Sequence, residues 1–385
     1  MLPTPVRRLL LVPLIIVTGC ALAVLAPPVA LLSWAVNLIR RRPDDLAGED
    51  SKVRWLNRRG PVRHYRLLRL MILGLTWMAG EAAALSVFLA LWIASGFGGR
   101  LNTEPYQLRH YAVLRRFLDV LYRVALRELR LTVTVAGPPE TDGPPETGDQ
   151  PETGGQPGDR PLIVLSRHGG PGDSVLIIHY LLSECQRRPR VVMKATLQLD
   201  PTVDIVANRL PNVFLNRSSA TGVNGTRMRT EQIRRLAAGM RGRSALLIFP
   251  EGGNWTPLRW NRAVERLRRR GRPDLAARAA AMPNLLPPHG SGALTAIAAC
   301  PAADVVFLGH TGLDRLVSVG DIWRSLHTDL EIRGRWWFVP ADRVPRTAGP
   351  EDQLNWLYDW WERLDAWITA QDPAAAEPGP APAGA

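Results

Sequence analysis

The 385-residue chain is poor in cysteine and in metal-binding patterns. Its three cysteines, Cys20, Cys185 and Cys300, lie far apart in the sequence, so they provide neither a disulfide framework nor a thiolate metal site. Thiols this sparse suit a reducing compartment. No two of the seven histidines have the spacing of metal ligands, and we therefore expect no bound metal.

The sequence also lacks two signatures that would assign its function directly. No Gly-x-Ser-x-Gly elbow occurs in the chain, so the serine nucleophile of many hydrolases is absent. The net charge is +13, yet there is no basic helix with interleaved aromatics, zinc spacing or RNA-binding motif. We therefore expect no nucleic-acid partner.

Positive charge is instead concentrated beside apolar segments near the amino terminus. The first 69 residues contain twelve Lys or Arg against four Asp or Glu. Because cations next to a membrane gain about 1 kcal/mol each near anionic headgroups, this distribution favours membrane lipids as partners.

Residues 9–38 are almost entirely apolar, with arginines on both flanks. About 20 such residues cross a bilayer, so this segment is long enough to span one. A signal peptide is one alternative, since the sequence ending at Cys20 resembles a lipoprotein cleavage box, but the apolar run continues well past that cysteine. A core helix of a soluble protein is the other alternative, and the length of the segment argues against it.

A second apolar segment covers residues 67–97 and is interrupted at Gly80-Glu81, while Pro27-Pro28 interrupts the first. A carboxylate at membrane depth is costly, so Glu81 marks either a bend near the interface or a face turned toward protein. Residues 40–69 carry ten Lys or Arg, which predicts a cytoplasmic loop. Two full crossings would place that loop opposite the rest of the chain. We therefore expect at least one re-entrant hairpin and a protein at the cytoplasmic face of the cell membrane.

Two motifs carry the candidate chemistry, and each follows a short apolar run. Residues 167–173 read Arg-His-Gly-Gly-Pro-Gly-Asp, and residues 249–253, which begin 81 positions after His168, read Phe-Pro-Glu-Gly-Gly. The runs before them, residues 161–166 and 244–249, have the length of buried strands. Ligands of open α/β sheets bind at the carboxyl ends of the strands, where both motifs would lie.

The first motif predicts a general base with an orienting carboxylate. On a straight helix with ~3.6 residues per turn, His168 and Asp173 would lie about 140° apart, but the glycines between them permit a turn that brings them together. Asp173 then fixes the tautomer of His168 and leaves the other ring nitrogen to accept a proton. Ser166 and Ser174 flank the motif without an elbow, so the activated hydroxyl is expected to belong to the substrate.

The remaining pattern divides the chain into a membrane-associated helical region at residues 1–99 and a catalytic domain at residues 100–370. Within that domain, residues 137–160 are rich in Pro, Gly and acids and bury too little apolar surface to fold, which predicts a disordered insertion. Residues 371–385, rich in Pro and Ala, are expected to form a disordered tail.

Apolar periodicity predicts the other elements of the domain. Helices are expected at residues 106–130, 174–185, 230–240, 261–281 with a break at 271–273, 290–299 and 352–369. Strands are expected at residues 129–135, 191–196, 213–216, 305–308 and 329–339. Lys194 and Arg217 stand at strand ends, where Arg217 is placed either to bind a phosphate or to form a surface ion pair.

The order of these motifs resembles that of the lysophosphatidate acyltransferase family, the 1-acylglycerol-3-phosphate O-acyltransferases. The resemblance covers about residues 100–370. It rests on His168 with Asp173, the strand that leads to Arg217, the sequence Phe-Pro-Glu-Gly at residues 249–252 and the apolar block at 305–309. Residues 284–292 are also similar to a Leu-Leu-Pro segment of the longer eukaryote-like members, which include lysocardiolipin acyltransferases.

The resemblance implies an α/β fold with a mixed central sheet flanked by helices. It implies acyl-CoA as co-substrate, a lysophospholipid as acceptor and no further cofactor. His168 would act as general base and Asp173 would orient it, while substrate binding would fall to Lys194, Arg217, Glu251, Gly252 and Gly253. Gly253-Asn254 stands where the family has Thr-Arg, so a phosphate-binding arginine is missing there, and Arg259 is a candidate to replace it.

The favoured hypothesis is an acyltransferase that makes phosphatidate from 1-acylglycerol-3-phosphate. Three alternatives stay open: an acyltransferase or transacylase for a lysophospholipid with another headgroup, a non-catalytic lipid-binding protein on the same fold, and a membrane-anchored hydrolase that uses Ser166 or Ser174. The sequence does not indicate an oligomeric state.

Overall fold

A computed structural model describes residues 4–39, 66–136, 159–170, 172–215, 223–315, 319–326 and 329–371. These residues form two compact units. The first unit takes its residues from 1–132, 198–209 and 318–330, and the second from 133–197, 210–317 and 331–385. The predicted insertion at residues 137–160 lies outside the described residues up to 158, and so does the predicted tail from residue 372 onward.

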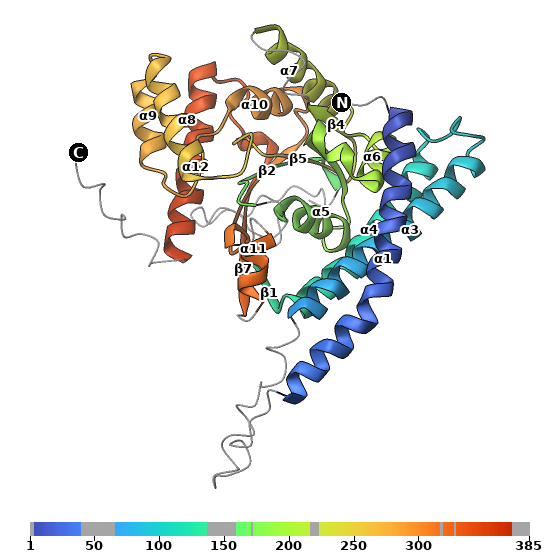
Figure 1. Cartoon of the computed structure of the whole chain (residues 1–385). Coiled ribbons are helices and arrows are strands. Elements are labelled where there is room, and N and C mark those ends of the chain that lie inside the picture. Colours follow the sequence, from blue (N-terminus) through green and yellow to red (C-terminus); the bar gives the residue numbers. More distant parts are fainter. Residues whose placement is uncertain are drawn as a thin grey trace. The chain divides into compact units, whose positions relative to one another are not determined.

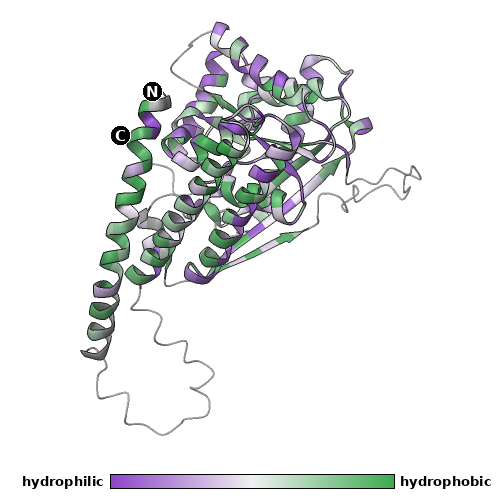
Figure 2. Cartoon of the chain, turned by 90° about the vertical axis from the view of Figure 1, so that its right-hand side faces the viewer, coloured by the Kyte–Doolittle hydropathy of each residue, from purple (hydrophilic) through white to green (hydrophobic). Residues whose placement is uncertain are grey.

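The first unit is built on three long helices, α1 (Thr4–Ile39), α3 (Arg66–Ala94) and α4 (Glu104–Glu128). Helix α3 packs against both α1 and α4 (Figure 1). Glycine permits the close approach to α4, because a Cβ on Gly80 would lie 2.4 Å from a ring carbon of Phe117. Both α1 and α3 are long and apolar enough to cross a membrane. The helix that starts at the amino terminus is hydrophobic along most of its length (Figure 2).

The predicted interruptions of these two helices are wrong. Helix α1 continues through Pro13, Pro27 and Pro28, and α3 continues through Gly80 and Glu81. A proline removes one backbone hydrogen bond and leaves the rest of the helical ladder in place, which a long apolar helix tolerates. Glu81 is fully buried, so it faces protein, one of the two alternatives considered. Neither helix turns back on itself, so no re-entrant hairpin lies within them. The basic loop at residues 40–65 lies outside the described residues, and the cytoplasmic orientation stays a prediction.

Two short helices of the first unit, α6 (Pro201–Arg209) and α11 (Val319–Ser325), were not predicted. Helix α6 holds the start of α1 through a buried carboxylate, Asp204. One oxygen of Asp204 accepts a hydrogen bond from Arg7 at 2.5 Å, and the other accepts one from Arg8 at 2.7 Å. The arginines predicted to face anionic lipid headgroups at this end of α1 therefore bind a protein carboxylate.

The second unit contains a seven-stranded sheet with the strand order β1-β7-β6-β2-β5-β3-β4. Its strands are β1 (Leu131–Ala136), β2 (Leu162–Ser166), β3 (Arg188–Lys194), β4 (Val213–Leu215), β5 (Ser244–Ile248), β6 (Asp304–Thr311) and β7 (Leu330–Val339). The adjacent strands from β6 through β4 are parallel, whereas β7 runs antiparallel to β6. The predicted mixed α/β fold is confirmed.

Helices cover both faces of this sheet (Figure 1). They are α5 (Asp173–Ser183), α7 (Val223–Ala238), α8 (Pro257–Arg269), α9 (Pro273–Ala280), α10 (Gly290–Ala299) and α12 (Pro350–Gln371). Alternate residues of a strand point to opposite faces, so Val164 packs with α5 while Ile163 and Leu165 pack with α7, α10 and α12. Full burial of such side chains contributes roughly 1.5–3 kcal/mol each.

The tryptophans of α12 belong to this core. Trp361 is fully buried, and the ring of Trp360 stacks on Phe307 of β6 at 4.6 Å between centroids. Elsewhere the bounds of predicted and observed elements differ by up to seven residues, and those of α10 agree at both ends. The predicted break at residues 271–273 separates α8 from α9.

Candidate active site

His168 and Asp173 lie together where β2 leads into α5. Strand β2 ends at Ser166, and α5 begins at Asp173 itself. His168 Nδ1 and Asp173 Oδ2 are 2.8 Å apart, so the turn that the glycines permit brings the two side chains into contact. Asp173 is fully buried, whereas 13% of the His168 side chain is exposed. Among the described residues, Nε2 of His168 has no hydrogen-bond partner.

Asp173 is held as a carboxylate by four donors. Its Oδ1 accepts hydrogen bonds from the Ser174 backbone amide at 2.6 Å and the Ser174 hydroxyl at 3.2 Å. Its Oδ2 accepts from the Gly170 amide at 3.2 Å as well as from His168. Burial raises the pKa of Asp173, but the bond from His168, the nearby His310 and the Gly170 amide outweigh it and hold the pKa below its usual value. An ionised Asp173 selects the His168 tautomer with its proton on Nδ1, which leaves Nε2 as a proton acceptor.

Glycine is required in the His168 turn because the turn lies directly against the end of β6. A Cβ on Gly170 would lie 2.9 Å from the carbonyl oxygen of Leu313, and one on Gly169 would lie 3.2 Å from Cε1 of His310. The Leu313 carbonyl group, at this distance, leaves no room for a side chain on Gly170. The close approach fixes the position of the turn that carries His168.

Glu251 joins the two motifs through the backbone. Its Oε1 accepts a hydrogen bond from the His168 amide at 3.2 Å, and its Oε2 accepts one from the Leu286 amide at 3.4 Å. The Trp255 amide donates to the His168 carbonyl at 3.0 Å. The ring of Phe249 stacks on the imidazole at 4.5 Å between centroids. Two segments 83 positions apart therefore position one histidine, as expected from their places at the ends of neighbouring strands.

The carboxyl group of Glu251 is close to neutral at physiological pH. Burial raises its pKa to about 8, with the charge of Asp173 adding to the shift and the Arg167 cation opposing it. Glu251 therefore serves the site through its contacts with the His168 and Leu286 amides. Its predicted contact with substrate stays a prediction.

The site also contains Arg167 and His310, for which the sequence motifs predict no role. Arg167 Nη1 donates to the His310 carbonyl at 2.6 Å, and His310 Nε2 lies 3.3 Å from the Arg167 carbonyl and 3.8 Å from Asp173 Oδ2. Burial, reinforced by the Arg167 charge, lowers the pKa of His310 to about 4, so this imidazole is neutral near pH 7. His310 is the last residue but one of β6, the strand that pairs with β2, and the strand-end rule that located His168 would also have located it.

One known family matches the part of the chain that contains this geometry. Residues 149–312 match the model of the Acyltransferase family. The match includes both motifs together with Arg167 and His310, so the hydrogen-bonded group described above lies wholly within it. No curated protein and no solved structure matched the chain significantly.

The two serines that flank the His168 motif are not placed to act as nucleophiles. Ser166 is fully buried, and its hydroxyl donates to the Arg167 carbonyl at 2.9 Å. The Ser174 hydroxyl donates to Asp173. Neither hydroxyl is hydrogen-bonded to the His168 ring, so the geometry gives no support to the hydrolase alternative.

The structure describes two of the three basic residues considered for substrate binding. Lys194 is the last residue of β3, and Arg217 lies outside the described residues. Arg259 is exposed at the first turn of α8, where its Nη1 donates to the Asn254 carbonyl at 3.0 Å. The substrate contacts of these three residues stay predictions.

The glycines after Glu251 have distinct backbone roles. Gly252 has a φ of +67°, and its amide donates to the Phe249 carbonyl at 3.0 Å. Gly253 is buried, and its amide donates no hydrogen bond among the described residues. Within the described part of the chain, no group of three or more His, Cys, Asp or Glu side chains is placed to hold a metal ion.

Proposed function

We propose that this protein transfers a fatty acyl group from acyl-CoA to the free hydroxyl of a lysophospholipid, with 1-acylglycerol-3-phosphate as the acceptor and phosphatidate as the product. One observation carries the proposal. Within an acyltransferase domain, His168 presents an uncommitted Nε2 while the buried Asp173 holds its Nδ1 at 2.8 Å. That arrangement suits a general base that acts on a hydroxyl supplied by the substrate.

In the proposed reaction, His168 Nε2 takes the proton of the acceptor hydroxyl as the oxygen attacks the thioester carbonyl. A new C–O bond forms and the carbonyl oxygen becomes an oxyanion. The intermediate then collapses, the C–S bond breaks, and the departing thiolate of CoA takes the proton from the imidazolium. Asp173 stays ionised throughout and stabilises the positive charge that His168 carries between the two transfers.

We assign the oxyanion contact to the amide of Gly253. Gly252 and Gly253 are both expected to bind substrate, but the Gly252 amide already donates to the Phe249 carbonyl, whereas that of Gly253 has no partner among the described residues. A backbone donor aimed at an oxyanion contributes about 3 kcal/mol in other acyl-transfer enzymes. The fixed turn at Gly252 would hold such a donor without reorganisation during the reaction.

The proposed acceptor and donor are both amphiphilic, which suits a protein with membrane-type helices. Helices α1 and α3 are long and apolar enough to cross a membrane, and they would keep the domain beside its lipid substrates, at the cytoplasmic face in our proposal. Lys194, the last residue of β3, and Arg217, two positions after β4 in the sequence, are proposed to bind the phosphate of the acceptor.

An acceptor panel tests this proposal. The purified full-length chain would be given radiolabelled oleoyl-CoA with lysophosphatidate, lysophosphatidylcholine, lysophosphatidylinositol or lysocardiolipin, beside the variant His168→Ala. We expect transfer to lysophosphatidate by the wild type and a loss of at least 10³-fold in the variant. Transfer to another acceptor alone would replace the substrate and keep the chemistry. Equal activity of the two proteins would overturn the role of His168.

A further inference from the structure

Helix α8 begins beside the His168 turn and carries a row of arginines away from it. The amide of Trp255, two residues before Pro257, donates to the His168 carbonyl, and the Thr256 side chain caps the helix by accepting from the Arg259 amide. With a rise of 1.5 Å per residue, Arg262 and Arg266 lie about 9 and 15 Å along the axis from this cap. The helix therefore begins beside the candidate active site, and the two arginines lie further along it.

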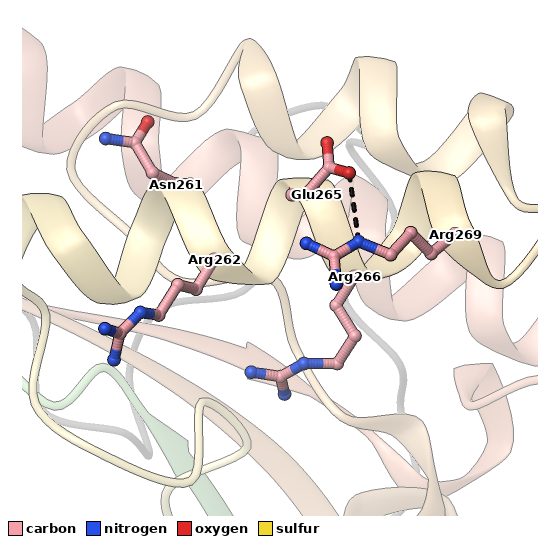
Figure 3. Close-up of a pocket in the computed structure, with 5 residues that line it drawn as sticks. All are labelled: Asn261, Arg262, Glu265, Arg266 and Arg269. Carbon is pink, nitrogen blue, oxygen red and sulfur yellow. Dashed lines mark hydrogen bonds and ion pairs between the residues drawn. The ribbon is translucent and has the colours of Figure 1, made fainter.

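Arg262 and Arg266 are one helical turn apart and extend to the same side of α8 (Figure 3). Asn261 and Glu265 point to the other side in the same view. All four line an open hollow together with Arg269. Both guanidinium groups are solvent-exposed, and neither has a hydrogen-bond or ion-pair partner among the described residues. Like charges at this spacing destabilise a helix, so the pair favours an anion that neutralises both.

Other arginines of the same helical hairpin do have acidic partners. Arg269 pairs with Glu265 at 3.0 Å, as the dashed line in Figure 3 shows. On the far side of the break, Arg272 pairs with Glu351 at 2.9 Å, and Arg278 pairs with Asp359 and Glu362 at 2.6 Å. Carboxylates are thus present around α8 and α9, and Glu265 itself lines the hollow. Its partners are Arg268 and Arg269, so Arg262 and Arg266 have no carboxylate partner among the described residues.

We infer that Arg262 and Arg266 bind phosphate groups of the acyl-CoA donor, an inference that rests on the proposed function. A guanidinium presents parallel N–H donors that match two phosphate oxygens. The two arginines are separated by about 6 Å along the helix, which suits two phosphates carried by one molecule. CoA carries a diphosphate and a 3′-phosphate at one end and its thioester at the other.

The position of the pair favours the donor over the acceptor as the source of phosphate. In lysophosphatidate the phosphate and the free hydroxyl are on adjacent carbons, so a hydroxyl at His168 keeps its phosphate close to His168. The long pantetheine arm of CoA separates the phosphates from the thioester instead. It would allow the thioester to reach His168 while the phosphates lie beside Arg262 and Arg266, further along α8.

The test compares Arg262→Ala/Arg266→Ala with the matched control Arg268→Ala/Arg343→Ala, which removes two exposed arginines outside the pair. Acyl transfer would be measured with oleoyl-CoA and with oleoyl-pantetheine, a thioester without phosphates. We expect the pair variant to raise KM for oleoyl-CoA by about tenfold or more, since it removes charge-assisted hydrogen bonds to phosphate. KM for the acceptor and turnover of oleoyl-pantetheine should be unchanged, and the control should match the wild type.

Equilibrium binding of free CoA, followed by calorimetry, separates this inference from the proposed reaction. If the wild type binds CoA and the pair variant binds it at least tenfold more weakly, the site stands even when no acceptor in the panel is acylated. An unchanged KM for oleoyl-CoA overturns it. A rise only in KM for lysophosphatidate assigns the pair to the acceptor, and a loss only of binding to phosphatidylglycerol vesicles assigns it to the membrane; either result refutes the donor site.

Discussion

The substitution Asp173→Asn separates the charge of the orienting residue from its shape. The Ser174 amide donates to Oδ1 at 2.6 Å, the shortest contact of this carboxylate, so the oxygen of the asparagine is expected to stay there. Its NH₂ group then takes the place of Oδ2 and faces His168 Nδ1. Because an amide NH₂ only donates, His168 must accept at Nδ1 and carry its proton on Nε2.

The expected cost follows from that change of tautomer. A protonated Nε2 does not take a proton from the acceptor hydroxyl, and the imidazolium formed in the reaction loses its anionic partner. In a serine protease triad, the equivalent change lowers kcat by about 10⁴-fold while the geometry is kept. That factor corresponds to about 5 kcal/mol of transition-state stabilisation. We expect a loss of 10³- to 10⁴-fold in this protein.

Transfer of labelled oleate from oleoyl-CoA, measured with saturating acceptor, gives kcat for Asp173→Asn. The control is Asp342→Asn, the same chemical change at an exposed aspartate, and it should be fully active. Circular dichroism and thermal unfolding of both variants would establish that the loss is catalytic. An Asp173→Asn protein within tenfold of wild-type kcat would refute the assignment of Asp173 as the group that selects the His168 tautomer.

Three further predictions follow from contacts within one or the other unit. Gly170→Ala puts a methyl group 2.9 Å from the Leu313 carbonyl oxygen. We therefore expect it to lower the free energy of unfolding by about 1–3 kcal/mol and to reduce kcat. The control Gly242→Ala should leave kcat unchanged. Burial raises the pKa of Glu251 to about 8, so between about pH 4.5 and 8 the native state binds a proton that the unfolded chain has released. The contribution of Glu251 to the free energy of unfolding therefore falls as pH rises through this range. Glu251→Gln should flatten the dependence of unfolding free energy on pH in denaturant titrations, and an identical dependence would contradict the shift. Asp204→Asn leaves the buried Arg7 without its anionic partner, which should destabilise the first unit by about 3–5 kcal/mol; thermal unfolding unchanged from wild type would contradict that estimate.

Much of the site was predictable because its strands and its motifs are local. The apolar runs before His168 and Glu251 have the length and composition of buried strands, and both are fully buried in the sheet as β2 and β5. Parallel strands end at the same edge, so the proximity of the two motifs followed from the strand assignment. The 2.8 Å contact between His168 and Asp173 followed from glycines that permit the turn.

Other features depended on partners that are distant in the sequence. The strand-end rule places His310 at the same edge of the sheet, but its contact with the His168 turn depends on the pairing of β6 with β2. The polar helix α6 has no clear apolar stripe, and its Asp204 is explained by Arg7 and Arg8, about 200 positions earlier. Gly80 is typical of a helix interruption in sequence, but in the structure it allows α3 to pack closely against Phe117 of α4. Such residues need tertiary contacts, which local periodicity does not supply.

The two carboxyl groups beside His168 have opposite electrostatic environments, and the contrast explains how the site uses them. Asp173 accepts four hydrogen bonds and keeps a pKa below its usual value, whereas burial raises the pKa of Glu251 to about 8. The negative charge of Asp173 itself contributes to the shift of Glu251. At neutral pH the charge is therefore concentrated on the carboxylate that contacts the imidazole ring, while Glu251 holds the backbone of His168. When His168 takes up a proton, its positive charge is stabilised by the group that also fixes its orientation.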